Sequence, residues 1–271
     1  MLFILCILFV CINAYHLTED LLQQVEDECH GALTCRWHHD ILLADWDSPS
    51  EDRVLLVFNE HARERVTGEL ALRLIQKLHE WQPEVDVTIV PVLNVWGRKR
   101  VEHGHPCLRK NEHGVDTNRN YQMHANRHHY SRFSEEYEGP TPLSEKESKL
   151  VSSELSGVRR YINVHSGEFS LYMPYDSRTR RPPHFDTMQH KISEWKAYCP
   201  QCTVGPAATT SFYKAYGTSV DWAIDHGVSE SYTFEVYGQE TRDCEKMFNP
   251  TDLSKILEMW LPILKNAVLK F

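Results

Sequence analysis

Short runs of β-branched and aromatic residues alternate along this chain with longer segments in which apolar residues recur every three or four positions. Runs of the first kind predict strands, and segments of the second kind predict amphipathic helices. The predicted strands are Val54–Phe58, Val85–Leu93, Arg160–Val164 and Tyr232–Val236. The predicted helices are Leu17–Cys29, Glu64–Trp81, Ser144–Ser156, Phe185–Lys196 and Thr251–Leu269.

Strands separated by helices of this length predict the α/β class, with a mixed, mostly parallel twisted β-sheet and helices on both faces. The chain has 271 residues, of which 41% are hydrophobic, and this is enough for the core of a single domain. In sheets of this kind, functional sites form beyond the carboxyl ends of the strands.

The first fourteen residues, Met1–Ala14, are almost wholly apolar and end in a small residue. This pattern is typical of a secretory signal peptide, and it is too short to span a bilayer. The predicted organisation is therefore a signal peptide over 1–14 and one domain over 15–271, with no membrane span after signal removal. We expect a secreted protein, or one in the lumen of a secretory or lysosome-like compartment.

The cysteine count agrees with export. Of eight cysteines, two lie in the predicted signal peptide, and the remaining six are Cys29, Cys35, Cys107, Cys199, Cys202 and Cys244. An even number in an oxidising compartment predicts up to three disulfides, whose pairing the sequence leaves open. Cys199 and Cys202 could instead form a redox or zinc pair, although the chain has no second Cys-x-x-Cys.

The formal net charge of −9 argues against a nucleic-acid partner. Binding to a phosphate backbone needs a basic surface, because lysine and arginine replace the counterions of the polyanion.

Three potential metal ligands follow predicted strands. His61 and Glu64 come directly after Val54–Phe58, and a spacing of three brings both side chains onto one face of a turn. His165 follows Arg160–Val164 and would emerge at the same edge of the sheet if the two strands are neighbours. Two histidines and a glutamate are a known ligand set for catalytic zinc. Taken singly, the first pair could be a solvated helical turn and His165 a buried structural histidine.

Glu235 stands inside the predicted strand Tyr232–Val236. Burying a carboxylate without a partner is costly, so a catalytic use or an ion pair is expected. Near an attacking water it could act as a general base, whereas the alternative is a structural ion pair with Arg242.

Several motifs occur in a fixed order, and together they resemble the zinc metallocarboxypeptidases, the family that contains carboxypeptidases A and B. The resemblance covers roughly Val54 to Phe271. The motifs are His61-Ala-Arg-Glu64, Arg109-Lys-Asn111, Gly114-Val-Asp-Thr-Asn118-Arg119-Asn-Tyr121, Tyr137-Glu-Gly-Pro-Thr-Pro-Leu-Ser144-Glu-Lys-Glu147, His165-Ser166, Tyr213 and Thr233-Phe-Glu235.

The resemblance implies one Zn²⁺ per chain, held by His61, Glu64 and His165. It also implies that Asp116 orients His61 through a hydrogen bond. Glu235 would take a proton from the attacking water and deliver one to the leaving amine. With the metal, Arg109 would stabilise the developing oxyanion.

The substrate implied by the resemblance is the free C-terminus of a peptide or protein. Its carboxylate would be held by Asn118, Arg119 and the hydroxyl of Tyr213, and Arg63 would support a subsite further along the peptide. All these residues come from one chain, and we expect a monomer.

The same resemblance places Val220 at the base of the side-chain pocket, with Ala208, Ala215 and Thr233 along its walls. These residues carry no charge, which predicts a preference for neutral C-terminal residues, aromatic or aliphatic. The chain departs from the family pattern at three places. Gly167-Glu168 replaces the usual tyrosine after the second zinc histidine, Tyr237-Gly238 follows Glu235-Val236, and Asn94-Val-Trp-Gly97 replaces the usual Asn-Pro-Asp-Gly.

Two other functions remain open on the sequence. One is a catalytically silent peptide-binding relative, which would have no need of Glu235, Arg109 and both histidines together. The other is a zinc amidohydrolase that removes acyl groups from amino acids. Asn118, Arg119 and Tyr213 favour peptide ends over that second alternative.

Overall fold

The computed structural model describes residues 15–122, 130–211 and 213–269. The predicted signal peptide, 1–14, lies outside the described residues. Within the described part of the chain, no helix has both the length and the apolar character needed to cross a membrane.

Eight strands form one sheet in the order β1-β2-β4-β3-β5-β8-β6-β7. The strands are β1 Leu33–His38, β2 Ile41–Trp46, β3 Arg53–Phe58, β4 Asp86–Val90, β5 Val158–His165, β6 Glu168–Met173, β7 Thr203–Pro206 and β8 Glu230–Tyr237. The pairs β3–β4, β3–β5, β5–β8 and β6–β7 are parallel, and the other neighbouring pairs are antiparallel. The predicted mixed and mostly parallel sheet is confirmed.

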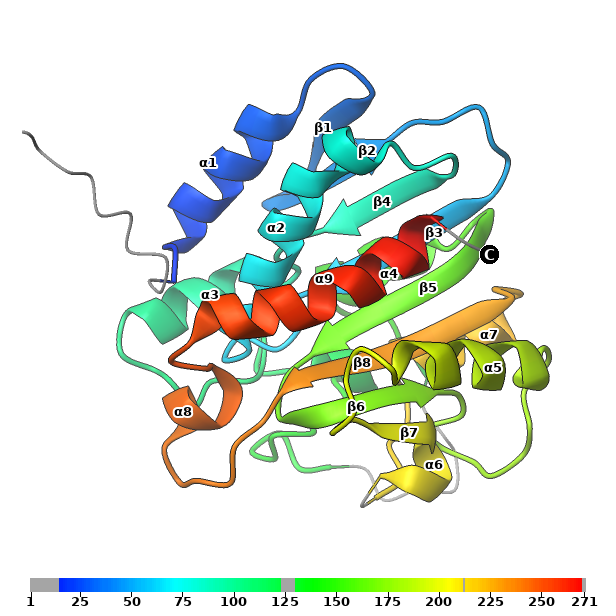
Figure 1. Ribbon diagram of the computed structural model, residues 1–271. Coiled ribbons are helices and arrows are strands. Elements are labelled where there is room, and N and C mark those ends of the chain that lie inside the picture. Colours follow the sequence, from blue (N-terminus) through cyan, green and yellow to red (C-terminus); the bar gives the residue numbers. More distant parts are fainter. Residues whose placement is uncertain (1–14, 123–129, 212, 270–271) are drawn as a thin grey trace, which may run out of the picture.

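Helices cover both faces of this sheet (Figure 1). In front of it α2 packs against both α1 and α9, whereas α4 and α7 contact each other behind it. The helices are α1 Thr18–Glu28, α2 Arg65–Trp81, α3 Val95–Glu102, α4 Lys146–Glu154, α5 Phe185–Trp195, α6 Ala207–Thr210, α7 Ser219–Asp225, α8 Cys244–Phe248 and α9 Leu253–Leu269, with a 3₁₀ turn η1 at Thr117–Arg119.

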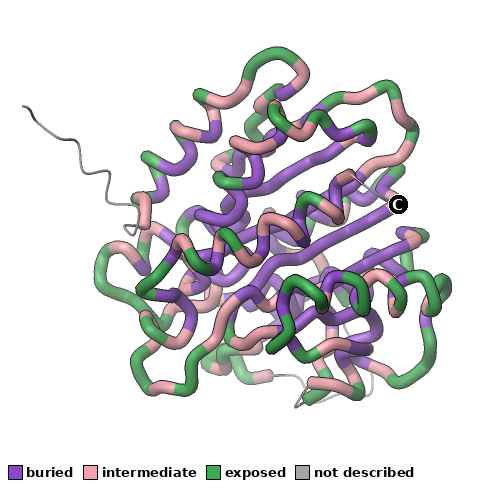
Figure 2. Tube along the Cα trace, in the orientation of Figure 1, coloured by how far each residue is buried: buried purple, intermediate pink, exposed green. Residues whose placement is uncertain are grey.

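The centre of the sheet is the core of the domain. Figure 2 shows the middle strands buried along most of their length, whereas the helices are buried on one side only. Residues Val54–Phe58 of β3 are fully buried because helices lie on both sides of that strand. This explains why β3 reads as a continuous apolar run in the sequence.

Four strands, β1, β2, β6 and β7, were not predicted. Of these, β1 and β7 are the edges of the sheet; β1 exposes most of its residues, and β7 has only four. An edge strand pairs on one side and packs on one face, so its sequence carries a weak hydrophobic signal.

The six cysteines of the described chain form three disulfides: Cys29–Cys35, Cys107–Cys244 and Cys199–Cys202. The pair at Cys199 and Cys202 is therefore neither a zinc site nor a free dithiol. Cys107–Cys244 joins segments 137 residues apart, the one before Arg109 and the start of α8.

Candidate active site

The three strands that lead to the predicted metal ligands or carry Glu235 are neighbours in the sheet. β5 lies between β3 and β8, all three run in parallel, and His165 is the register partner of Glu235. His61 and Glu64 follow the end of β3 and precede α2. The sheet therefore delivers all four side chains to one edge, as the carboxyl ends of parallel strands do.

The atoms of the three potential ligands converge on one point. His61 Nδ1 lies 2.7 Å from Glu64 Oε1, and His165 Nδ1 lies 3.0 Å from Glu64 Oε2 and 3.1 Å from His61 Nδ1. Nitrogen ligands at zinc distances in a tetrahedral site would be about 3.3 Å apart. The trio, which is buried, thus has the spacing and chemistry of a zinc site.

The electrostatics of the trio favour an ionised carboxylate at Glu64 and a positive charge on His165. Burial alone would raise the pKa of Glu64, but the two imidazoles hold it far below its usual range. Burial alone would lower the pKa of His165, yet the Glu64 carboxylate raises it to about 9.

The second nitrogen of each ligand histidine faces a buried carboxylate. His61 Nε2 lies 3.2 Å from Asp116 Oδ1, in the place that the sequence predicted for Asp116. His165 Nε2 lies 3.6 Å from Glu60 Oε2 and 3.3 Å from Asn118 Nδ2. A carboxylate at hydrogen-bond distance, as Asp116 is from His61, fixes the tautomer of a ligand histidine and leaves its other nitrogen free to bind metal. Glu60 lies beyond hydrogen-bond distance of His165 and acts on it through its charge. Glu60 was not predicted, although it directly precedes His61.

Glu235 reaches the cavity because of the alternation of β8. Tyr232, Phe234 and Val236 are buried on the other face of the strand, where Trp260 of α9 donates a hydrogen bond to the carbonyl of Val236. Glu235 Oε2 is buried with no hydrogen-bond partner among the described residues.

The environment of Glu235 suits proton transfer. Burial raises its pKa to about 8, His165 opposes this rise, and the carboxylates of Glu64 and Glu168 add to it. A carboxyl that gains and loses its proton near neutrality is what general acid–base chemistry requires. No ion pair with Arg242 forms among the described residues, so the structural alternative for Glu235 has no support.

Asp116 also fixes Arg109. The guanidinium donates to Asp116 Oδ2 at 2.8 Å, and Arg109, Arg119 and His61 hold the pKa of Asp116 well below its usual range against the effect of burial. Arg109 itself stays charged, since Asp116 outweighs the cost of its burial and raises its pKa.

The residues predicted to hold a carboxylate lie together at η1 and the loop before α7. Arg119 Nη2 lies 3.3 Å from the Tyr213 hydroxyl, and Arg119 Nη1 donates to the carbonyl of Asn118 at 2.9 Å. Arg119 is buried, whereas Tyr213 is 57% exposed, so its hydroxyl is accessible from solvent. The Asn118 side chain accepts a hydrogen bond from the main-chain nitrogen of Ser219.

Two neighbouring acids pair with the arginines that were predicted to bind substrate. Glu136 Oε1 lies 3.0 Å from Arg119 Nη2, and Glu135 Oε2 lies 3.0 Å from Arg63 Nη1. Arg63 also stacks on the ring of Phe248, 4.3 Å from its centroid. Neither acid was predicted, because acids in a polar loop are usually solvated.

These groups line one cavity of about 330 Å³. It is lined by His61, Arg63, Glu64, Arg109, Asn118, Arg119, His165, Ser166, Gly167, Glu168, Tyr172, Asp176, Ala207, Ser211, Tyr213, Ala215, Thr218, Thr233, Glu235 and Phe248. Val220 and Ala208 are absent from this lining, and Val220 is only 1% exposed. The structure therefore brings together every predicted metal, catalytic and carboxylate-binding residue but not the predicted base of the pocket.

Two of the departures from the family pattern, Gly167-Glu168 and Tyr237-Gly238, lie against each other. The Gly167 nitrogen donates to the carbonyl of Tyr237, and a β-carbon at Gly238 would overlap the carbonyl of Gly167. This close approach of two backbones requires glycine at 238. Glu168 therefore occupies the cavity rim beside Glu235.

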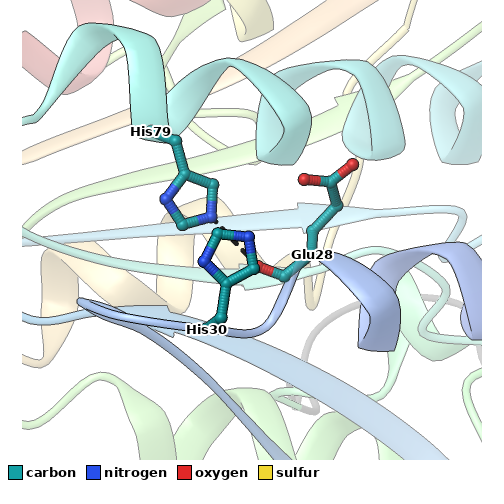
Figure 3. A group of neighbouring side chains, drawn as sticks. All are labelled: Glu28, His30 and His79. Atoms are coloured by element: carbon teal, nitrogen blue, oxygen red, sulfur yellow. Dashed lines mark hydrogen bonds between the residues drawn. The ribbon is translucent and has the colours of Figure 1, made fainter.

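None of the members of a second group of potential ligands, Glu28, His30 and His79, lines this cavity. Figure 3 shows how their side chains lie. The two imidazoles are stacked, with centroids 4.2 Å apart at an interplanar angle of 10°. Lone pairs in parallel ring planes do not converge on one ion, and His79 Nε2 already bonds to the carbonyl of Glu28 at 3.0 Å. The geometry describes a stacked pair and gives no reason to include it in the active site.

A His-Glu-His cluster at the carboxyl edge of a mixed α/β sheet is the architecture of a metallohydrolase. The chain matches the family model described as zinc carboxypeptidase over residues 41–262. It therefore belongs to the zinc carboxypeptidase family.

Curated relatives at moderate identity agree with this assignment. The chain is 28% identical to carboxypeptidase B of Rattus norvegicus over 225 residues, which are 69% of this chain and 52% of that protein. It is 30% identical to mast cell carboxypeptidase A of the same organism over 168 residues, 55% of this chain and 40% of that protein. The chain spans about half the length of the curated relatives it matches.

Solved structures share the fold. Bovine thrombin-activatable fibrinolysis inhibitor, solved in complex with a tick carboxypeptidase inhibitor, has a TM-score of 0.82 at 21% identity and covers 94% of this chain and 97% of its own. Carboxypeptidase A from Helicoverpa armigera has a TM-score of 0.80 at 21% identity, covering 94% and 73%. Murein-tripeptide amidase from Escherichia coli O157 is more distant, with a TM-score of 0.54 at 16% identity, covering 85% and 87%.

Proposed function

We propose that this protein is a secreted zinc-dependent carboxypeptidase that hydrolyses the last peptide bond of peptides and proteins. One observation carries the proposal. The ligand trio, Glu235 and Arg119 line the same cavity, so a group that cuts and a group that recognises a terminus are within reach of one substrate.

His61, Glu64 and His165 would hold the metal, since their spacing and their buried, negatively charged surroundings fit Zn²⁺. When bound, zinc polarises the scissile carbonyl and favours ionisation of water. Asp116 would keep the imidazole of His61 in the tautomer and orientation that this requires, and the carboxylate of Glu60 lies near the imidazole of His165.

Glu235 would transfer the protons of the reaction. Its unpaired Oε2 faces the cavity, where it can take a proton from the attacking water and pass one to the leaving amine. Arg109, held by Asp116, would place its positive charge beside the oxyanion that develops at the carbonyl.

Arg119, Asn118 and Tyr213 would bind the terminal carboxylate of the substrate. A buried guanidinium matches a carboxylate with two parallel hydrogen bonds, and an internal peptide bond offers no such partner. Arg63, stacked on Phe248, would contact residues further from the terminus. All of these groups belong to one chain, so the proposed activity needs no second copy.

The pairing of Arg119 with Glu136 predicts a competition with substrate. The substrate carboxylate must displace Glu136 Oε1, so we expect Glu136→Gln to lower KM several-fold, with little change in kcat. Initial rates on a peptide with a free C-terminus check this. Glu135→Gln is the matched control, because Glu135 pairs with Arg63 and not with Arg119. An unchanged KM in Glu136→Gln would contradict the prediction.

Export is the second part of the proposal. It is supported by the apolar segment 1–14 and by three disulfides, which persist in oxidising compartments. The expected preference for neutral C-terminal residues rested on Val220 as the base of the pocket. Val220 does not line the cavity, so it gives that preference no support.

Two alternative functions, a silent peptide-binding relative and a zinc amidohydrolase, can be separated from the proposal by one assay. The second has a counterpart among the fold relatives, since one of them is an amidase. The purified chain is assayed on a peptide panel with free C-termini and on N-acylated single amino acids, before and after chelation and with zinc restored.

We expect chelator treatment to abolish release of the C-terminal residue and stoichiometric zinc to restore it. Cleavage of the N-acylated amino acids alone would favour the amidohydrolase. Zinc and peptide binding without any cleavage would favour the binding protein.

A further inference from the structure

The side chain of Glu168 lies at the rim of the proposed substrate cavity, in one of the departures from the family pattern. Glu168 begins β6 and is half-buried. Its backbone is closely packed, since a β-carbon at Gly238 would overlap the α-carbon of Glu168. Among the described residues, no lysine or arginine pairs with its carboxylate. Glu168 therefore presents an unpaired negative charge to the cavity from a fixed backbone position.

The register of β6 and β8 gives the position of Glu168 relative to the proposed general base, Glu235. Ser170 of β6 is the register partner of Glu235 in β8. Tyr172 pairs with Thr233, two residues to one side, and Glu168 lies two residues to the other side. Two residues correspond to about 7 Å along a strand. Glu168 and Tyr172 thus lie on opposite sides of the general base.

The groups proposed to hold the terminal carboxylate lie on the Tyr172 side of the general base. The end of β6 that carries Tyr172 pairs with the end of β7, where α6 begins. The Ser211 hydroxyl lies 2.8 Å from the carbonyl of Ala207 in α6 and 2.7 Å from that of Tyr213. The Tyr213 hydroxyl in turn lies 3.3 Å from Arg119 Nη2. A peptide whose terminus is bound there must run past the general base toward the opposite side of the cavity.

On that opposite side, Gly167 leaves an open slot in the lining of the cavity. A β-carbon at this position would lie 3.4 Å from the ring of Phe248 and 3.7 Å from Glu235 Oε2. A larger side chain, such as the tyrosine of the family pattern, would occupy the space between them. Gly167 leaves this space free and is itself exposed. Because the slot touches the general base, the side chain that can enter it is that of the penultimate residue, next to the scissile bond.

The arginine on this side of the cavity is already paired. Arg63 stacks on Phe248, and its Nη1 lies 3.0 Å from Glu135 Oε2. The Tyr172 hydroxyl, which lies near Glu168, keeps its proton, because burial raises the pKa of Tyr172 and the Glu168 carboxylate adds to this rise. Neither group neutralises Glu168. A cation that enters the slot would therefore meet a carboxylate with no competing partner among the described residues.

We propose that Gly167 and Glu168 form a subsite that favours substrates whose penultimate residue carries a cationic side chain, lysine or arginine. The inference rests on the proposed carboxypeptidase function and concerns the residue before the scissile bond, not the residue that is released. The methylene stem of the penultimate side chain would pack against the Phe248 ring in the slot, and its ammonium or guanidinium group would pair with Glu168.

The test uses the zinc-loaded protein and peptides that share the C-terminal residue released fastest and differ only in the penultimate residue: lysine, arginine, norleucine, leucine or glutamate. Norleucine has the stem of lysine without its charge, so it isolates the contribution of the ion pair. We expect kcat/KM for the lysine peptide to exceed that for the norleucine peptide by about 10-fold at low salt. The ratio should decrease at high salt, because the pair is partly exposed.

In Glu168→Gln the same ratio is expected to fall to within about 2-fold of unity, because the lysine reaction loses its ion pair. Glu240→Gln is the matched control. Glu240 is an exposed acid after β8 that does not line the cavity, so the ratio should not change. If Glu168→Gln does not fold, Glu168→Ser and the salt dependence of the wild type provide the test.

The outcomes separate the subsite from the carboxypeptidase function. Equal rates of the wild type on the lysine and norleucine peptides overturn the role of Glu168, and so does a lysine preference that persists in the Glu168 variants. A uniform change of rate on all five peptides would mean that Glu168 acts on Glu235 and not on the substrate, which also overturns the subsite. Failure of the wild type to release any C-terminal residue overturns the carboxypeptidase function itself.

Discussion

Glu235→Gln is expected to reduce kcat by about 10² to 10⁴-fold while the protein still binds one zinc ion. Glutamine has nearly the volume of glutamate and can still accept a hydrogen bond, but it cannot take a proton from water. Glu235 is not one of the three converging ligands, so metal binding should remain stoichiometric. Steady-state rates on the best peptide, together with metal content measured on the same sample, check both parts.

Glu240→Gln is the matched control for this variant. Glu240 follows the same strand but is exposed, so its replacement should alter neither rate nor zinc content. Full activity of Glu235→Gln would remove Glu235 from the mechanism and leave only a structural explanation for its burial. Loss of zinc along with activity would instead show that Glu235 helps to hold the metal.

Arg119→Lys is expected to reduce kcat/KM by about 10² to 10³-fold for a peptide with a free C-terminus. Lysine keeps the charge but cannot form two parallel hydrogen bonds to a carboxylate, and its shorter reach would also loosen the contact with Tyr213. The same peptide with an amidated C-terminus lacks the negative charge that Arg119 would recognise. We therefore expect the rate ratio between free-acid and amidated peptides to shrink in the variant.

This ratio distinguishes recognition of a terminus from a general loss of structure, which would slow both peptides alike. Arg181→Lys is a suitable control, because Arg181 is exposed and stacks on Phe185 outside the cavity. A wild-type ratio preserved in Arg119→Lys would show that another group reads the terminal carboxylate.

The central fold was predictable from sequence because β3 is a continuous buried apolar run and because β5 and β8 are rich in β-branched and aromatic residues. His61 and Glu64 follow β3, whereas His165 ends β5 and Glu235 lies within β8. The peripheral strands β1 and β7 escaped prediction, since half-exposed or very short strands leave no clear hydrophobic pattern. The position of a residue at a strand end, such as His165, could thus be predicted from the sequence alone.

The positions of residues that lie in loops could not be predicted in the same way. Asp176 and Val220 are 44 positions apart in the sequence, and only the packing of the turn after β6 against α7 decides which of them faces the cavity. Glu136 is similar, because nothing in its local sequence distinguishes it from a solvated acid until Arg119 is seen beside it. The sequence therefore specifies the reaction chemistry better than it specifies the choice of substrate.

The register between β5 and β8 restricts where residues can be inserted into or deleted from this chain. His165 and Glu235 are register partners, and alternate residues of β8 face either the cavity or α9. Deleting one residue of β8 ahead of Glu235 would turn that carboxylate toward the apolar helix layer and bring a neighbouring apolar side chain to the cavity. Insertions and deletions should therefore be tolerated in the surface loops and excluded from these two strands.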